Sequence, residues 1–371
     1  MRVLYFSESY GPHDHRFLTF LAGSGWSVSY LRRRGGPVLE RRPLPDGVSV
    51  LPPLDPDPAR PRRLGIALLE PLRQALEQSR PDVVHAGPIP ACAYLVASAR
   101  FPRLVGMSWG SDLLDDASFG LARWQAIRAL RATSVFLGDC EAVRRRAVDL
   151  GMDERRTVIF PWGVDLETFR PGPPAFARQR LGWEERTVFL CLRSWETRYG
   201  VDTVVEAFLR AARRDADLRL ILAGDGSLRP GLIERIESSG LADRFWIPGY
   251  VAYSELPMLY HSADVYVSGA HSDGSSVSLL EAMACGLPCL VTDIPGNREW
   301  VEAGRSGLWF QPGDVAGLAN RMIEAAGLRS TWAALGSRGR DITESRADWR
   351  RNAPRMIEAY QRALSGPEVA A

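Results

Sequence analysis

Two carboxylates and a run of small residues lie within one short stretch, DGSSVSLLEAMACGLPCL, at residues 273–290. Glu281 follows Asp273 by eight positions, and Ser275 or Ser276 between them can begin a helix. The first N–H groups of a helix point out of its end and favour phosphate. The stretch therefore suits a ligand with two clusters of hydroxyl groups and a phosphate bridge between them. The alternative is an ordinary loop and helix with two incidental acids.

Two arginines form a second candidate anion site. Arg193 follows a predicted strand over residues 187–192, and Arg198 lies five positions later. Guanidinium groups at the C-terminal end of a parallel strand suit a diphosphate. All 46 basic residues of the chain are arginine, so two unrelated surface arginines are the alternative.

Strands and helices are predicted to alternate along the whole chain. A strand at 3–6, an amphipathic helix through Phe17 and a strand at 26–31 open the sequence, and this order predicts a parallel sheet. Helices are expected at 64–78, 329–342 and 349–364. Further strands are predicted at 82–85, 104–107, 134–137, 187–192, 218–223, 265–268, 289–292 and 308–310, with a strand and turn at 245–251.

Composition narrows the class of protein. A chain of 371 residues with 46% hydrophobic and 24% charged residues has the length of two globular domains. Its net charge of only +2 argues against nucleic acid as a partner. Five cysteines without clustered histidines predict buried free thiols, no metal and no cofactor. Without a signal sequence or a membrane-spanning run, we expect a cytoplasmic protein.

These motifs resemble those of the retaining GT-B glycosyltransferases of family four, over about residues 1–364. The first stretch is similar to the family's E-x7-E region, with Asp273 replacing the first Glu. The two arginines resemble R-x4-K-G, with Tyr199 inserted before the glycine. Residues 161–171 resemble P-N-G-V-D-x-x-x-F-x-P, with Trp162 in place of Asn.

The resemblance implies an α/β GT-B fold, in which two Rossmann-like doubly wound domains face a cleft. The acceptor domain would comprise residues 1–165, with a C-terminal helix at 348–365 crossing back to it. The nucleotide-sugar domain would comprise residues 166–347.

The activity implied is a retaining, metal-independent transfer of a hexose from a UDP-sugar or GDP-mannose to a hydroxyl of a glycan, lipid-linked or small-molecule acceptor. The leaving phosphate would help to deprotonate the incoming hydroxyl. The alternatives are a nucleotide-sugar 2-epimerase or hydrolase on the same fold, or a non-catalytic nucleotide-sugar-binding subunit.

The resemblance also assigns site residues. Those expected to be catalytic are Arg193, Arg198 and Asp273. Donor contacts are expected from Gly11, Gly226, Val251, Gly274, Ser275, Ser276, Val277, Ser278 and Glu281. Acceptor contacts are expected from His13, His15, Arg16, Trp109 and Asp112.

Trp109 stands where many relatives carry a histidine, in a His-Gly-x-Asp segment. Its indole could stack on an acceptor ring or pack in the core. A separate cluster of arginines, between Arg32 and Arg63, suggests peripheral contact with an anionic membrane, and a solvated loop is the alternative.

Overall fold

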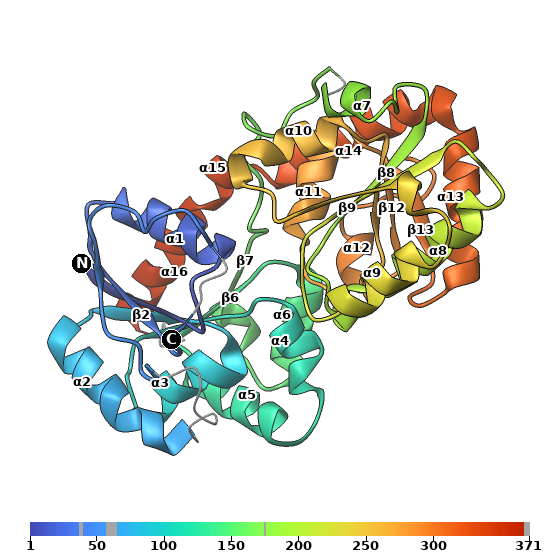
Figure 1. The fold of residues 1–371 in the computed structure, drawn as a ribbon. Coiled ribbons are helices and arrows are strands. Elements are labelled where there is room, and N and C mark those ends of the chain that lie inside the picture. The colour runs from blue at the N-terminus through green and yellow to red at the C-terminus, as the bar shows by residue number, and fades with distance from the viewer. Residues whose placement is uncertain (37–39, 57–64, 174–175, 367–371) are drawn as a thin grey trace. The chain divides into compact units, whose positions relative to one another are not determined.

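The computed structural model describes residues 1–36, 40–56, 65–173 and 176–366 (Figure 1). The chain divides into two compact units. Unit 1 contains Met1–Trp162 and the C-terminal segment that begins at Arg350, and unit 2 is Gly163–Trp349. Each unit is built on one parallel sheet with flanking helices, which confirms the predicted fold class.

The sheet of unit 1 has the strand order β3-β2-β1-β4-β5-β6-β7, and every neighbouring pair is parallel. Because β1 lies between β2 and β4, the strand order reverses there, and ligands of such sheets bind outside the strand ends at this point. The strands are β1 (Arg2–Ser7), β2 (Ser27–Arg32), β3 (Val48–Val50), β4 (Val83–Ala86), β5 (Leu104–Met107), β6 (Val135–Gly138) and β7 (Thr157–Ile159).

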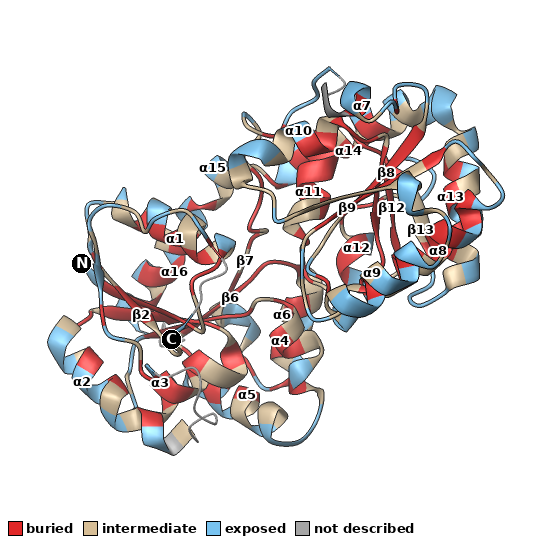
Figure 2. Ribbon diagram, in the orientation of Figure 1, coloured by how far each residue is buried: buried red, intermediate tan, exposed pale blue. Residues whose placement is uncertain are grey.

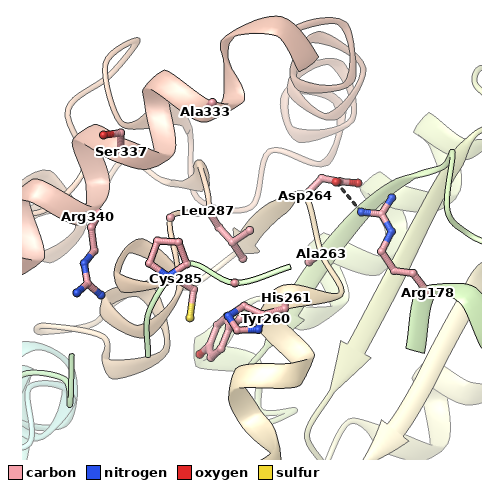
Figure 3. Close-up of a pocket in the computed structure, with 13 residues that line it drawn as sticks. Arg178, Tyr260, His261, Ala263, Asp264, Cys285, Leu287, Ala333, Ser337 and Arg340 are labelled. Atoms are coloured by element: carbon pink, nitrogen blue, oxygen red, sulfur yellow. Dashed lines mark hydrogen bonds and ion pairs between the residues drawn. The ribbon is translucent and has the colours of Figure 1, made fainter. Parts of the chain in front are cut away.

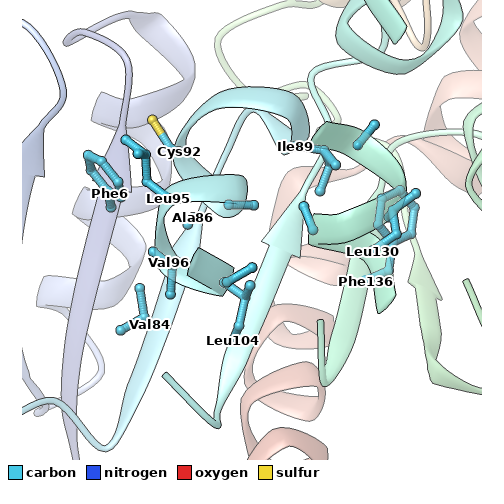
Figure 4. Packing of buried hydrophobic residues seen from close by; sticks show 14 of the residues in the cluster. Phe6, Val84, Ala86, Ile89, Cys92, Leu95, Val96, Leu104, Leu130 and Phe136 are labelled. Atoms are coloured by element: carbon cyan, nitrogen blue, oxygen red, sulfur yellow. The ribbon is translucent and has the colours of Figure 1, made fainter. Parts of the chain in front are cut away.

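Helices cover this sheet with apolar faces. In α1, Phe17, Leu18 and Leu21 are buried at helical spacing. Figure 4 shows Phe6, Val84, Leu104 and Phe136 from four strands packing together. The helices are α1 (Pro12–Ala22), α2 (Leu69–Ser79), α3 (Tyr94–Ser98), α4 (Ser111–Leu114), α5 (Gly120–Ala132), α6 (Glu141–Asp149) and α16 (Pro354–Ser365), with a π-helical turn at Ile89–Ala93.

The C-terminal segment differs from its prediction as one helix over 349–364. It forms α15 (Trp349–Asn352) and then α16, which packs on β4, β5 and β6 of unit 1. Pro354 is the first residue of α16, where its missing N–H costs no helical hydrogen bond. The predicted helix over 64–78 also begins later, at Leu69, after a 3-10 turn at Gly65–Leu68.

The sheet of unit 2 has the order β10-β9-β8-β11-β12-β13, again with parallel neighbours. The central strands β8, β11 and β12 are almost entirely buried apolar runs, whereas β10 at one edge is only half-buried (Figure 2). Val188 and Leu190 of β8 pack in one hydrophobic cluster, whereas Phe189 and Cys191 pack in another. The strands are β8 (Thr187–Leu192), β9 (Leu218–Ala223), β10 (Phe245–Gly249), β11 (Val265–Ser268), β12 (Cys289–Thr292) and β13 (Gly307–Phe310).

The helices of unit 2 complete both layers. They are α7 (Phe176–Arg180), α8 (Val201–Ala212), α9 (Arg229–Glu237), α10 (Leu256–His261), α11 (Val277–Ala284), α12 (Pro295–Arg298), α13 (Val315–Gly327) and α14 (Trp332–Arg346). The helix predicted over 329–342 corresponds to α14, which follows a 3-10 turn at Arg329–Thr331. No helix within the described ranges has both the length and the apolar character needed to cross a bilayer.

Candidate functional site

The strand order of unit 2 brings the two sequence motifs together. β8 lies between β9 and β11, so the loops after β8 and β11 leave the sheet side by side at its reversal point. Arg193 begins the first loop, and Asp273 lies in the second. Gly200 and Gly269 let the loops touch: a Cβ on Gly200, whose φ is +57°, would lie 2.0 Å from the carbonyl oxygen of Gly269.

Arg193 is the centre of the site in unit 2. Its Nη2 forms an ion pair with Asp273 Oδ2 at 2.5 Å, and its Nη1 donates to the hydroxyls of Ser276 and Ser278. The Tyr199 ring lies 4.2 Å from the guanidinium carbon, in cation–π contact. Burial lowers the pKa of Arg193, but the charge and hydrogen bond of Asp273 together with the neighbouring Tyr266 and Tyr199 outweigh it, so the pKa is raised.

Helix α11 begins at this cluster. Ser276 occupies the N-cap position, but its side chain makes no capping bond, and its hydroxyl instead accepts a hydrogen bond from Arg193. Ser275 Oγ accepts from Trp300 Nε1 at 3.0 Å. At the other end, Gly286 with a φ of +78° closes the helix, because its N–H bonds to Met283 O and the next N–H bonds to Ala282 O. The predicted strand after this turn is β12.

Glu281 lies inside α11 rather than at its end, and it is buried. The hydroxyl of Tyr260, from α10, donates to Glu281 Oε2 at 2.8 Å. Burial and the neighbouring Glu281 raise the pKa of Tyr260 well above its ordinary value. The tyrosine is therefore protonated and holds the carboxylate as a fixed donor. Sequence spacing did not indicate Tyr260, which is 21 positions from Glu281.

Arg198, Gly226, Gly274 and Val251 lie in loops of the same unit, whereas Gly11, also predicted for the donor, lies in unit 1. Arg198 is exposed in the 3-10 turn Thr197–Tyr199, and its carbonyl accepts from His271 N. A Cβ on Gly226 would lie 2.6 Å from Trp195 O, so this turn requires glycine. Gly274 N donates to Asp273 Oδ1 at 3.0 Å, and half-buried Val251 follows β10.

In unit 1, a carboxylate that the sequence analysis did not identify holds the loop after β1. Asp14 is buried, and its Oδ2 accepts from Gly11 N at 2.7 Å, which fixes Gly11 at the start of α1. Burial raises the pKa of Asp14 to about 7. An acid three positions after a glycine at a helix start was the available sequence signal.

Aromatic rings surround the residues predicted for the acceptor. The rings of His13 and Trp109 are stacked, with centroids 5.1 Å apart and an interplanar angle of 29°. Phe17 and Trp162 lie against the indole of Trp109, which remains half-buried. Burial and the nearby Arg16 lower the pKa of His13 to about 3, so the imidazole is neutral. The geometry supports both a packing role and a stacking role for Trp109.

Asp112 serves the loop that carries Trp109. Its buried carboxylate accepts from Ser108 Oγ at 2.6 Å and from the backbone N–H groups of Trp109 and Ile89, both at 2.8 Å. Burial raises its pKa to about 6. These three bonds show that Asp112 positions the loop of Trp109, and its contact with an acceptor stays a prediction.

Arg16 and His15 complete the set predicted for the acceptor. Arg16 Nη1 donates to the carbonyl of Trp162 at 3.0 Å. His15 is half-buried, and its ring centroid lies 6.3 Å from that of Tyr10. The structure therefore gathers His13, Trp109 and Arg16 around Trp162, with His15 beside Tyr10.

The arginine cluster of unit 1 is partly neutralised. Arg33 forms an ion pair with Glu8 at 2.5 Å, and Arg42 pairs with Glu40 at 2.6 Å. Arg60, Arg62 and Arg63 lie outside the described residues. These pairs favour the solvated-loop interpretation over a continuous basic surface.

A cavity of about 460 Å³ lies at the C-terminal end of α11, away from Asp273 and Ser276 at its N-terminal end (Figure 3). Tyr260, His261, Cys285 and Arg340 are among its lining residues. Arg340 donates to the carbonyls of Phe169 and Ala284, and His261 bonds to Arg170 O. These polar groups thus hold the segment that enters unit 2. Within the described ranges, no three His, Cys, Asp or Glu side chains could hold a metal ion.

Two family models match the chain. "Glycosyltransferase Family 4" matches residues 13–168, and "Glycosyl transferases group 1" matches residues 175–356. The chain is 34% identical to D-inositol 3-phosphate glycosyltransferase of Geodermatophilus obscurus, over 60% of this chain and 53% of that protein. It is 32% identical to the GDP-mannose-dependent alpha-(1-6)-phosphatidylinositol monomannoside mannosyltransferase of Mycobacterium tuberculosis, over 51% of each chain. It spans about half the length of these relatives.

Solved structures match the fold over nearly the whole chain. Sucrose-phosphate synthase from Thermosynechococcus elongatus has a TM-score of 0.82 and 18% identity, covering 98% of this chain and 100% of that one. Anabaena HepE in complex with UDP-glucose has a TM-score of 0.77 and 20% identity, covering 97% and 100%. At these identities the likeness concerns the fold.

Proposed function

The chain belongs to the group 1 glycosyltransferases of family four, and from that membership we propose that it transfers a sugar from a nucleoside diphosphate sugar to a hydroxyl group of an acceptor. The observation that carries this proposal is the Arg193 cluster at the end of β8. A largely buried guanidinium there meets two serine hydroxyls at the start of α11. Such a group of donors suits a diphosphate.

The donor is held by unit 2. Arg193, the Ser276 and Ser278 hydroxyls and the first N–H groups of α11 bind the diphosphate, and exposed Arg198 joins them. Glu281, fixed by Tyr260, accepts hydrogen bonds from the ribose. Asp273 accepts hydrogen bonds from hydroxyls of the transferred sugar. The donor is a UDP-sugar or GDP-mannose: the name of the mycobacterial relative specifies GDP-mannose, and HepE was solved with UDP-glucose.

The transfer retains configuration at the anomeric carbon. The incoming hydroxyl attacks from the face that the diphosphate leaves, and the leaving phosphate oxygen takes its proton. Arg193 stabilises the negative charge that develops on this oxygen, and it does so best in a largely buried site. In this scheme the protein supplies no nucleophile and needs no metal ion.

The acceptor is bound by unit 1. The His13–Trp109 pair offers an aromatic face and a neutral imidazole, which together suit a hydroxyl-rich ring. The acceptor belongs to the glycan, lipid-linked or small-molecule class. Two relatives are named for inositol compounds. Contact with anionic lipid at the arginine cluster stays a weaker prediction.

Incubation with UDP-glucose or GDP-mannose, with and without candidate acceptors, tests the proposal. We expect diphosphate release that depends on the acceptor and persists in excess EDTA, with a product of retained configuration. Free sugar or epimerised donor without an acceptor would indicate the hydrolase or epimerase alternative. Binding without turnover toward any acceptor would indicate a non-catalytic subunit.

A further inference from the structure

The ion pair between Arg193 and Asp273 joins two groups to which the proposed function gives different ligands. Arg193 is assigned to the diphosphate and Asp273 to the sugar, yet here they bind each other at 2.5 Å. Their side chains are only 8% and 16% exposed. The serine hydroxyls occupy Nη1, so both terminal nitrogens of the guanidinium already have partners. A phosphate oxygen that binds Nη2 on the side of Asp273 therefore replaces a contact that the protein makes with itself.

We propose that this ion pair makes the site discriminate between the complete sugar donor and the bare nucleoside diphosphate, an inference that rests on the proposed function. A complete donor replaces both partners together, because its diphosphate meets Arg193 and its sugar hydroxyls meet Asp273. A bare diphosphate meets Arg193 alone. It leaves a largely buried carboxylate without its cation and beside a second anion, which is unfavourable.

The backbone around Asp273 makes this exchange depend on the side chain. A Cβ on Gly296 of α12 would lie 2.4 Å from the carbonyl oxygens of both Asp273 and Gly274. The loop is thus packed directly on α12 and cannot withdraw in that direction. Asp273 also accepts from Gly274 N at 3.0 Å, so its other oxygen faces Arg193 from a fixed base. Side-chain rotation is the way for Asp273 to exchange the guanidinium for a hydroxyl.

The same exchange favours release of the product. Transfer removes the sugar from the diphosphate, and Asp273 then has no hydroxyl partner. Its return to Arg193 competes directly with the product diphosphate for the guanidinium. Asp273 therefore acts as a specificity-determining residue that weakens binding of the bare product.

Calorimetric titration of UDP, GDP, UDP-glucose and GDP-mannose tests the inference on the full chain. In Asp273→Asn, Arg193 loses its counter-charge, so we expect the bare diphosphate to bind about tenfold tighter or more. The complete donor should gain less, so the ratio of the two affinities changes. Asp217→Asn is the matched control, because Asp217 pairs with Arg186 just before β8 and β9, at the opposite end of these strands from Arg193, and its loss should leave the ratio unchanged.

Unchanged or weaker binding of the bare diphosphate by folded Asp273→Asn would overturn the inference. The wild-type protein gives a test that needs no variant: a bare diphosphate that binds tenfold tighter than its sugar donor would also overturn it. Asp273→Glu keeps the charge and should keep the wild-type ratio. Failure of the wild-type protein to bind any of the four compounds would instead count against the proposed function.

Discussion

The two units differ in how they treat charge near the C-terminal ends of their strands. In unit 2, charges are retained and paired: the largely buried Arg193 forms an ion pair with Asp273. In unit 1, burial removes charge, because it raises the pKa of Asp14 to about 7 and lowers the pKa of His13 to about 3. The site in unit 2 holds a paired charge, and the site in unit 1 combines aromatic rings and a neutral imidazole with the Arg16 guanidinium, which bonds to the Trp162 carbonyl.

This difference indicates which kind of ligand each unit can bind. Attraction to a diphosphate dianion offsets the desolvation penalty of a guanidinium in a largely buried site. An uncharged sugar hydroxyl gains little from a formal charge, but it gains from neutral hydrogen-bonding groups beside an aromatic face. The following changes test whether charge in unit 2 and neutrality in unit 1 have the roles that this comparison gives them.

Arg193→Ala should cause the largest loss. Removing the cation at the end of β8 should lower kcat/KM by an amount that corresponds to about 2–4 kcal/mol of lost transition-state stabilisation, typical of losing one charge-stabilising donor. Steady-state kinetics with a saturating acceptor measures this. Arg298→Ala, which removes the exposed arginine of another ion pair in unit 2, is the control and should change little. Equal losses in both variants would break the claim that charge at Arg193 is special.

Asp14→Asn tests the neutral character of unit 1 through pH. The folded protein keeps the Asp14 proton up to about pH 7, whereas an unfolded chain releases it near the ordinary value of 3.8. The folded state thus binds more protons between these values, and its free energy of unfolding falls as pH rises through this window. Asp14→Asn abolishes that fall, which we expect to be on the order of 4 kcal/mol.

Thermal unfolding at several pH values between 4 and 7.5 measures the effect of Asp14→Asn. Burial lowers the pKa of His13 and of His85, a buried residue of β4, to about 3, and the titration of both is common to the two proteins and cancels in their difference. Asp46→Asn, at an exposed position of unit 1, is the control. A constant difference in melting temperature between wild type and Asp14→Asn would mean that Asp14 is already charged in the folded protein.

Much of the fold followed from the sequence because most strands are apolar runs, and the two central candidates follow strands: Arg193 comes directly after β8, and Asp273 lies in the loop after β11. In a parallel sheet these positions share one edge, so Arg193 and Asp273 could be expected on the same side of unit 2. Their resemblance to a known family, now confirmed, supplied the pairing of distant segments. The roles of these residues toward a ligand stay predictions.

The side-chain contacts were beyond the sequence because they depend on loop geometry and packing. The 80 positions between Arg193 and Asp273 gave no sign that the two would bind each other. The inserted Tyr199 looked like a disruption of the arginine motif, yet its ring packs on Arg193. Asp112, predicted to meet an acceptor, is committed to the loop of Trp109 by three hydrogen bonds that only the fold brings together.

Trp109→Ala tests whether the aromatic face in unit 1 binds the acceptor. Loss of the indole should weaken acceptor binding by about 1.5 kcal/mol, the upper range for an aromatic contact, so the KM of the acceptor should rise about tenfold. The diphosphate affinity should not change. Kinetics with varied acceptor and calorimetry with UDP or GDP separate the two effects. Trp124→Ala, at an exposed tryptophan of α5, should alter neither. A lower melting temperature with an unchanged KM would assign Trp109 to packing.

The smallest expected effect concerns Tyr260, which donates to Glu281, the carboxylate proposed to hold the ribose. Tyr260→Phe removes one hydroxyl, 2.8 Å from Glu281 Oε2, and preserves the ring that packs beside α11. We expect about 1 kcal/mol weaker binding of both the bare diphosphate and the sugar donor, because Glu281 loses a fixed donor but keeps its charge.

Glu281→Gln should weaken the binding of both ligands more, because the proposed acceptor of the ribose hydroxyls is then neutral. Calorimetry on the single and double variants gives their coupling. Independent, additive losses would show that Tyr260 acts elsewhere, whereas a double variant no weaker than Glu281→Gln would show that it acts through this carboxylate.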